Sequence, residues 1–495
     1  MVVIGAGMGG MAVAARLAVK GHTVTVVEQS STYGGKLGSF TRAGFTFDTG
    51  PSLLTLPAVY RDLFAKTGGQ LEDSVELVDL EPAFGYLFPD GSRVEMPGVD
   101  AGLCAAALGD AFGGTAEADW RAFMRRAADI WQVTRRPFLE SPLTGPRDLI
   151  PLARNVSSLR TVAPLTSLRG LAAHYLHDPR LRMLVDRYAT YTGSDPRKAP
   201  AALATVPYVE QTFGAYHVAG GLRRLADALH ARTLERGVTY RMSSDVGEVR
   251  TDSARVTGVR LVSGEVLDAD VVVANADATH LYRDLVRDPR GAPPLRRLRR
   301  ATPSLAGFVL LLAVHGRTPD LRHHNVWFPR DYDAEFDAIF GRHPQPVDDP
   351  TIYVCAPDDE AMRPDADHES WFVLVNAPRH STTGERGTID WTVPGLAQSY
   401  RDRVLAVMAS RGYDVRDRLL WNEIRTPADL EFDTRAPGGS IYGTSSNGTR
   451  AAFLRPANAS PVPGLFLVGG SAHPGGGLPL VGMSAEIVAN LIGRA

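Results

Sequence analysis

The chain has 495 residues, of which 44 % are hydrophobic and 22 % charged, and this ordinary globular composition excludes a disordered or fibrous protein. Its 53 basic residues nearly balance 55 acidic ones, so there is no basic field to hold nucleic acid and we expect none to bind. The two cysteines, Cys104 and Cys355, exclude a disulfide framework and a cysteine zinc site, and we expect both to be buried thiols in a reducing compartment.

The N-terminal residues predict a dinucleotide-binding unit. A β-branched strand over Val2–Ile4 is followed by Gly-x-Gly-x-x-Gly at Gly5–Gly10, an alanine-rich helix to about Lys20, and a second strand that ends at Glu28. In this arrangement the first glycine makes a tight turn, the second lets the backbone approach a pyrophosphate, and the third lets the helix pack on the strand. The helix N-terminus holds the phosphates, and Glu28 accepts hydrogen bonds from the ribose. Gln29, in a place where an Arg would bind a 2′-phosphate, disfavours NADP.

Two segments after Glu28 bear on which dinucleotide this unit binds. They are Tyr33-Gly34-Gly35-Lys36 and Phe47-Asp48-Thr49-Gly50-Pro51-Ser52. A Gly-Gly-Lys followed by Phe-Asp-x-Gly-Pro resembles the flavin-containing amine-oxidase and carotenoid-desaturase superfamily. The resemblance implies that both segments line FAD and that Lys36 contacts its phosphate or ribityl region.

The next residues, 86–217, are predicted to be mainly helical and to begin a substrate domain. Asp186-Arg187-Tyr188-Ala189-Thr190-Tyr191 resembles a motif of carotenoid desaturases, especially the branch that acts on hydroxylated or methoxylated acyclic carotenoids. Asp186, Tyr191 and Glu210 are candidates to receive a proton or steer a cation, with Arg187 as an orienting partner. For each of these residues taken alone, a salt bridge or a buried hydroxyl is the more ordinary explanation.

Strand-and-turn alternation over residues 218–279 resembles the returning half of an FAD domain, in which the backbone at Val246 meets the adenine. The apolar run Leu305 to Val314 is too short for a membrane span, which needs about 18–20 residues, and predicts a buried strand. His323-His324 lacks metal-ligand spacing, so we expect this pair on the surface and no metal site.

Two arginine-bearing regions leave alternatives open. Residues 135–168 mix Leu, Pro and Arg, which fits either helices packed on the core or a surface that dips into a bilayer. The second region is a cluster of arginines between residues 287 and 300, for which a solvated helix face is favoured over contact with lipid phosphates. Its members are Arg287, Arg290, Arg296, Arg297, Arg299 and Arg300.

The C-terminal residues 464–492 strongly resemble the terminal signature of phytoene-desaturase-type enzymes. A strand ends at Gly469-Gly470, a Gly/Pro-rich loop runs over 473–480, and a helix is predicted from Ser484 to Ile492. The resemblance implies that the loop wraps the flavin and that the helix N-terminus near Met483 faces the flavin edge, where its dipole stabilises the reduced anion. Many related flavoproteins have Gly-Asp where this chain has Gly470-Ser471.

The predicted fold class is α/β (α+β overall), with a Rossmann-like FAD-binding domain of the two-dinucleotide flavoprotein type and an inserted mixed sheet-plus-helix substrate domain. The FAD domain is expected over residues 1–85, 218–279 and 436–495, and the substrate domain over 86–217 and 280–435. The residues expected to bind FAD are Gly5, Ala6, Gly7, Gly9, Gly10, Glu28, Gly35, Lys36, Gly50, Pro51, Ser52, Val246, Gly470, Leu478, Pro479 and Met483.

The resemblance implies an FAD-dependent desaturase of an acyclic carotenoid or a precursor such as phytoene. Desaturation takes a hydride from an allylic carbon to the flavin and loses a proton from the neighbouring carbon. The alternatives are a carotenoid ketolase or oxygenase of the same fold, a flavin amine oxidase, and an FAD-binding lipid escort without enzymatic activity. The C-terminal loop offers Gly, Leu and Pro rather than the aromatic residues expected beside an amine.

With one dinucleotide fingerprint, the chain has no evident NADPH site, so O2 or a membrane quinone is the expected electron acceptor. A polyene substrate implies peripheral contact with a membrane. No positive region precedes the apolar residues 1–15, so we expect a cytoplasmic protein, bound peripherally to the inner face of the cell membrane.

Overall fold

A five-stranded parallel sheet gathers strands from distant parts of the chain. The computed structural model describes residues 1–143, 145, 148, 156–448 and 451–495. The strand order is β21-β13-β1-β2-β9, formed by Leu465–Leu467, Val272–Ala274, Val2–Ile4, Thr25–Val27 and Thr239–Arg241. The central strands are rich in valine and buried on both faces, as expected for a parallel sheet that is covered on both sides.

Alternate residues of β1 pack into two different layers. Val3 faces a core formed with helices α1 (Met8–Ala18), α10 (Arg223–Glu235) and α17 (Leu478–Ile492), against which α2 (Ala58–Lys66) also packs. Val2 and Ile4 face a second core on the other side. This second core includes the antiparallel sheet β10 (Val246–Thr251), β11 (Val256–Leu261) and β12 (Val266–Asp268), together with α11 (Ala278–His280), η4 (Leu281–Leu285) and α12 (Ala292–Leu298).

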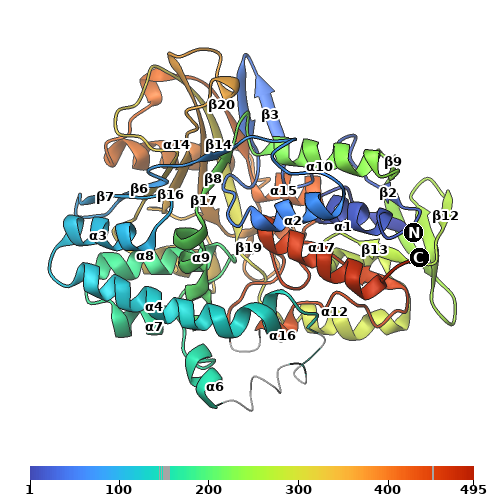
Figure 1. Cartoon of the computed structure of the whole chain (residues 1–495). Coiled ribbons are helices and arrows are strands. Elements are labelled where there is room, and N and C mark those ends of the chain that lie inside the picture. Colours follow the sequence, from blue (N-terminus) through green and yellow to red (C-terminus); the bar gives the residue numbers. More distant parts are fainter. Residues whose placement is uncertain (144, 146–147, 149–155, 449–450) are drawn as a thin grey trace.

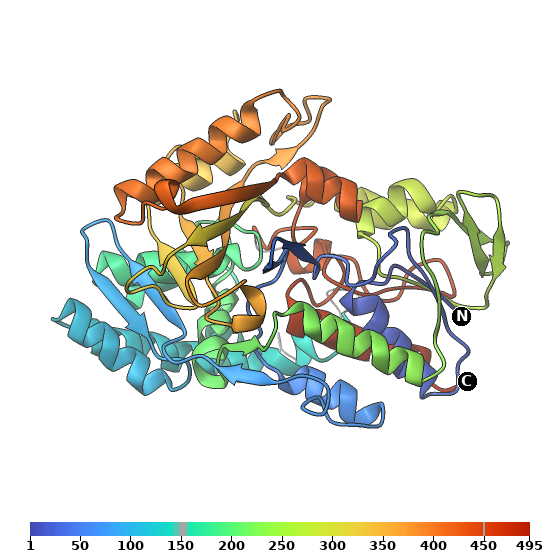
Figure 2. The same ribbon diagram turned by 90° about the horizontal axis from the view of Figure 1, so that it is seen from above.

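A seven-stranded mixed sheet forms the second part of the molecule, and Figure 2 shows it on the side away from the two termini. Its order is β20 (Leu419–Arg425), β14 (Ala306–His315), β17 (His368–Ala377), β16 (Ile352–Cys355), β15 (His324–Trp327), β6 (Phe84–Leu87) and β7 (Arg93–Met96). Neighbouring strands are antiparallel except β15 and β6. The predicted strand Leu305 to Val314 is therefore confirmed as β14, and it lies inside this sheet.

Successive residues of β14 point to opposite faces of this sheet, so each face packs against a different element. Leu310 and Leu312 of β14 face α14 (Leu396–Ser410), whereas Leu311 and Val309 face the hairpin β3 (Ser39–Arg42) and β4 (Phe45–Asp48). A helical layer packs beside β6 and β15 (Figure 1). It comprises α3 (Ala101–Phe112), α4 (Ala116–Thr134), α7 (Leu168–Tyr175), α8 (Pro179–Thr190), α9 (Thr205–Phe213) and α13 (Tyr332–Phe340).

Smaller elements join these layers. They are β5 (Leu77–Asp79), β8 (Tyr216–Val218), β18 (Arg379–His380), β19 (Thr388–Ile389), α6 (Val156–Val162), α15 (Pro427–Thr434), α16 (Ala451–Leu454), the π-helix η1 (Arg135–Leu139), and the 3-10 turns η3 (Ala201–Ala204), η5 (Pro289–Gly291), η6 (Glu360–Met362), η7 (Arg416–Arg418) and η8 (Pro437–Gly439). In the described part of the chain, no helix combines the length and the apolar character that crossing a membrane needs.

The mixed α/β fold class is confirmed, and the two cysteines are free and buried as predicted. The domain boundaries stay a prediction. The stretch 135–168, predicted as either core helices or a membrane surface, is described only in part. Its residues 144, 146–147 and 149–155 lie outside the described residues. Five arginines of the predicted cluster are exposed, namely Arg287, Arg296, Arg297, Arg299 and Arg300.

The start of α1 requires a glycine at position 10. A Cβ atom at Gly10 would overlap the backbone carbonyl oxygen of Gly5, so no side chain fits there without moving the strand or the helix. We expect Gly10→Ala to lower the free energy of unfolding by about 1–3 kcal/mol, the usual cost of overpacking. Chemical denaturation measures this loss. Gly247→Ala is the matched control, because the nearest atom to its Cβ would be in the Val262 side chain at 3.5 Å, an ordinary van der Waals contact. An equal loss in both variants would contradict the argument.

Candidate cofactor and substrate site

A cavity of about 1050 Å³ runs between the parallel sheet and the seven-stranded sheet. One end is lined by backbone and glycines, and the other by aliphatic and aromatic side chains. Of the residues expected to bind FAD, those that line this cavity are Gly5, Gly7, Gly9, Glu28, Gly35, Lys36, Gly50, Pro51, Ser52, Val246, Gly470, Leu478 and Pro479. Ala6, Gly10 and Met483 do not line it.

The loop after β1 is held by Glu28 at the end of β2. The Glu28 carboxylate accepts the backbone N–H of Ala6 at 2.7 Å through Oε2 and that of Ser30 at 2.8 Å through Oε1. Burial raises the pKa of Glu28, and these two N–H donors oppose the rise. Ala6 therefore contributes by fixing the acid, and Gly10 contributes by letting α1 approach β1.

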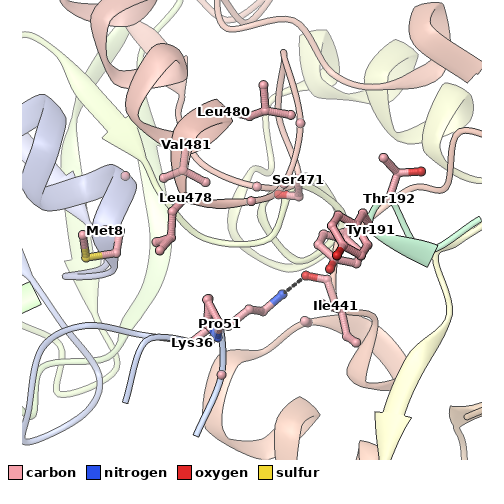
Figure 3. Close-up of a pocket in the computed structure, with 18 of the residues that line it drawn as sticks. Met8, Lys36, Pro51, Tyr191, Thr192, Ile441, Ser471, Leu478, Leu480 and Val481 are labelled. Atoms are coloured by element: carbon pink, nitrogen blue, oxygen red, sulfur yellow. Dashed lines mark hydrogen bonds between the residues drawn. The ribbon is translucent and has the colours of Figure 1, made fainter. Parts of the chain in front are cut away.

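Lys36 is enclosed rather than solvated. Its Nζ donates to the backbone carbonyls of Ser440 at 3.1 Å and Ile441 at 2.6 Å, which ties the second glycine segment to the chain after α15 (Figure 3). Burial lowers the pKa of Lys36 to about 8, against the attraction of Asp277. A half-buried cation whose hydrogen-bond partners among the described residues are carbonyls is suited to an anionic group in the cavity beside it.

The C-terminal helix begins earlier than the sequence predicts. α17 starts at Leu478 rather than Ser484, with Pro479 in its first turn, where a missing N–H costs nothing. Leu478 and Val481 point into the cavity beside Met8 (Figure 3). Met483, the expected helix start, lies in the second turn of α17 and does not line the cavity. The prediction that the helix N-terminus lies near Met483 is therefore wrong, and Leu478 takes that place.

The glycine-rich loop before α17 offers the space that a bound ring system needs. A Cβ at Gly477 would meet no atom within 4 Å, although this residue lines the cavity. His473 of the same loop is buried, and its Nε2 lies 2.9 Å from the carbonyl of Ser141, while burial lowers its pKa to about 4. The open backbone at one end, the acid at Glu28 and the half-buried cation at Lys36 fit FAD.

Three of the four predicted catalytic residues come together at the cavity. Arg187 and Tyr191 lie one turn apart on α8 and its end, and the guanidinium donates to the Tyr191 hydroxyl at 2.6 Å. Tyr191 in turn donates to the carboxylate of Glu210 at 3.0 Å, and Tyr188 donates to the same carboxylate at 2.6 Å. Burial raises the pKa of Glu210, and Arg187 opposes the rise.

Asp186 does not belong to this group. Its carboxylate pairs with Arg169 at 2.8 Å and does not line the cavity. Neighbouring residues of a helix point about 100° apart, so Asp186 and Arg187 cannot share a face. Burial raises the pKa of Asp186 to about 6, and Arg169 opposes that rise.

The sequence interpretation missed a histidine behind the cavity. His323 and His324 were expected on the surface, but the side chain of His324 is fully buried and burial lowers the pKa of His323 to about 3. β15 lies inside the sheet between β6 and β16, and all four of its residues, from His324 to Trp327, are buried, so both of its faces are covered. The Tyr353 hydroxyl joins Nδ1 of His324 at 2.8 Å to the Ser52 hydroxyl at 2.7 Å.

The far end of the cavity is apolar. Its lining comes from α4, η1, α6, η3, α9, the strands β14 and β17, and loop residues at 143 and 305. The residues are Trp131, Phe138, Leu139, Leu143, Leu159, Val162, Leu203, Val206, Val209, Leu305, Val309, Phe372 and Leu374.

Comparison with known proteins gives one consistent result. A family model described as "Flavin containing amine oxidoreductase" matches residues 8–379. The 4,4'-diapolycopene oxygenase of Methylomonas sp is 33 % identical to this chain, and the match covers 99 % of this chain and 97 % of that protein. The hydroxyneurosporene desaturase of Rubrivivax gelatinosus is 35 % identical, and the match covers 99 % of this chain and 93 % of that protein. The solved structure of an oxidoreductase from Methanosarcina mazei shares the fold, with a TM-score of 0.65 at 16 % identity and 99 % coverage of both chains. The chain therefore belongs to the flavin containing amine oxidoreductase family and is an FAD-dependent oxidoreductase.

Proposed function

We propose that the protein desaturates an acyclic carotenoid or a precursor such as phytoene. The observation that carries the proposal is the apolar half of the cavity, which continues without a break from the glycine-lined half. A long hydrocarbon needs such a lining, because it offers no polar group for recognition. The hydroxyneurosporene desaturase of Rubrivivax gelatinosus, at 35 % identity over nearly the whole chain, supports the same reaction class.

The residues at the glycine end would hold FAD. In the proposal, Glu28 binds the ribose, the backbone at Val246 meets the adenine, and Lys36 faces the phosphate or ribityl region. Gly50, Pro51 and the first turn of α17 at Leu478 face the flavin ring. When bound, FAD supplies a two-electron acceptor for a hydride.

The protein's own part in the reaction is to position a substrate and keep water out. Trp131, Phe138 and Phe372 enclose the apolar half of the cavity, where hydride loss leaves a delocalised cation and water would capture it. Tyr191 points toward Ile441 and Lys36 from the opposite wall (Figure 3). We assign Glu210 and Tyr191 to stabilise that cation, with Arg187 orienting the Tyr191 hydroxyl.

A carotenoid oxygenase is the second candidate function. It is favoured by the 33 % identity to the 4,4'-diapolycopene oxygenase of Methylomonas sp, which also covers nearly the whole chain. The two reactions differ in the mass of the product, because desaturation removes hydrogen and oxygenation adds oxygen.

We propose that the substrate enters from the inner face of the cell membrane and that O2 or a membrane quinone reoxidises the flavin. Leu159 and Val162 of α6 line the cavity, and Leu165 just after them is 88 % exposed. In Figure 1, α6 projects from the lower edge, along which α12 with its exposed arginines also lies. Exposed leucine and arginine along one edge suit the boundary between acyl chains and phosphates.

Pigment analysis tests the reaction. The gene is expressed in one host that accumulates phytoene and in another that makes a 1-hydroxylated neurosporene, with the empty vector as the control. We expect products with two hydrogens fewer per step and absorption at longer wavelength. Products that carry added oxygen with unchanged desaturation would contradict the first proposal and support the oxygenase. Unchanged pigments in both hosts would contradict both.

The assignment of Glu28 is tested by cofactor affinity. Glu28→Gln keeps the shape of the side chain but removes its charge, and hydrogen bonds to charged groups contribute about 1.5–3 kcal/mol. We expect the Kd for FAD to rise at least about tenfold in a flavin-fluorescence titration of the apoprotein. Glu248→Gln on β10 is the control, since Glu248 pairs with Arg260 and does not line the cavity. An unchanged Kd in Glu28→Gln would reject the assignment.

The membrane surface is tested by vesicle binding. Leu165→Asp places a charge where the proposal puts acyl chains, so we expect less protein to sediment with vesicles of phosphatidylglycerol and phosphatidylcholine. Val262→Asp is the matched control, because Val262 is 69 % exposed on the turn between β11 and β12. Equal binding of both variants and the wild type would place the membrane contact elsewhere.

A further inference from the structure

A chain of buried hydrogen bonds leads from the cavity into the seven-stranded sheet. The Ser52 hydroxyl lies 2.7 Å from the Tyr353 hydroxyl, which lies 2.8 Å from Nδ1 of His324. Ser52 and Tyr353 line the cavity, whereas His324 lies behind them and is 0 % exposed. The chain therefore connects the reaction space to an imidazole that bulk water does not reach.

Two further histidines continue from His324 toward the surface. The ring centres of His324 and His323 are 4.6 Å apart, and those of His323 and His217 are 4.7 Å apart. His217 Nε2 lies 2.8 Å from the carboxylate of Asp359, whose side chain is 15 % exposed. Within the described residues, Nε2 of His323 and Nε2 of His324 are buried without a hydrogen-bond partner. Such nitrogens are costly to bury, and both remain free to give or take a proton.

The fixed charges around this row of histidines favour movement of a proton from the cavity toward the surface. On the cavity side, the Arg187 guanidinium lies 5.7 Å from the centre of the Tyr353 ring, and its charge opposes protonation of His324. On the outer side, the carboxylates of Asp358 and Asp359 favour protonation of His323. A proton placed on His324 is therefore repelled from the cavity and attracted toward Asp359.

The imidazoles of His324 and His323 are both ready to accept a proton. Burial holds the pKa of His324 well below its ordinary value and that of His323 at about 3, so each ring is neutral at physiological pH. A low pKa does not prevent the transfer, because the donor is a carbocation, which is a far stronger acid than an imidazolium.

We propose that Ser52, Tyr353 and His324 carry the substrate proton out of the dry cavity, with His323, His217 and Asp359 completing the route to solvent. The inference rests on the proposed desaturation. One hydrogen leaves the substrate as hydride, for which FAD is the acceptor. On the adjacent carbon a C–H bond breaks, its electron pair forms the new C=C bond, and its proton passes to the Tyr353 oxygen, directly or through Ser52. The proton of the Tyr353 hydroxyl moves at the same time to Nδ1 of His324.

The test is anaerobic reduction of the FAD-loaded protein by the carotenoid identified in the pigment analysis. The carotenoid is delivered in phosphatidylcholine vesicles, and the rate of flavin reduction is measured by absorbance in H2O and in D2O. Tyr353→Phe keeps the ring and removes the hydroxyl from the chain. We expect reduction to slow by about 100-fold, as for loss of a general base, and the ratio of the H2O and D2O rates to depart from that of the wild type. Ser52→Ala should change both in the same direction but less.

Tyr400→Phe is the matched control, because it removes the hydroxyl of a buried tyrosine whose ring packs against Phe308 of the same sheet and which does not line the cavity. It should retain the wild-type rate and solvent ratio. The FAD content per protein molecule is measured for every variant, so that a folding defect is seen directly. His324→Gln provides a second break in the chain of hydrogen bonds. If Tyr353→Phe keeps the wild-type rate and ratio, or if Tyr400→Phe changes as much, the relay is overturned. If no carotenoid reduces the wild type, the proposed function is overturned and this inference with it.

Discussion

The site depends on the parallel pairing of β1 with β13 and of β13 with β21. These strands are far apart in sequence, and parallel pairing places their carboxyl ends at one edge of the sheet. The loops that follow are in direct contact there. A Cβ at Gly9 would crowd the side chain of Asn275 and would lie 3.0 Å from Cα of Gly469. Glycines at these positions are needed to bring three loops together, and the cofactor half of the cavity is the space between them.

The parts of the fold that could be predicted from the sequence are those set by local chemistry. β1, α1, β2 and Glu28 follow one another within 28 residues, and each has a sequence signal of its own. Arg187 and Tyr191 are separated by one helical turn, so their contact also follows from spacing. The start of α17 was missed because glycine and proline indicate a loop, yet a proline in the first turn is compatible with a helix.

Other features depend on packing between distant segments. The lack of metal-ligand spacing at His323-His324 suggested a surface pair, but all four residues of β15, which begins at His324, are buried. The contact of Ser52 with Tyr353 joins residues 301 positions apart, and no local pattern announces it. Asp186 was grouped with Arg187 because they are neighbours in sequence, although the helix turns them in different directions. Polar groups enclosed in an apolar cavity cost free energy unless they bond to one another, which explains why Arg187, Tyr191 and Glu210 form one connected group.

The order of strands also has a consequence for how the protein is made. β1 is the third strand of the sheet and is synthesised first, whereas β21 at the sheet edge contains residues 465–467. Contacts of such high sequence separation form slowly, and a ribosome that has not yet released residue 467 cannot supply the last strand. The nascent chain therefore exposes one edge of β13 until residues 465–467 have been synthesised. Cofactor loading must follow synthesis of β21, and until then the open sheet edge is free to pair with other chains.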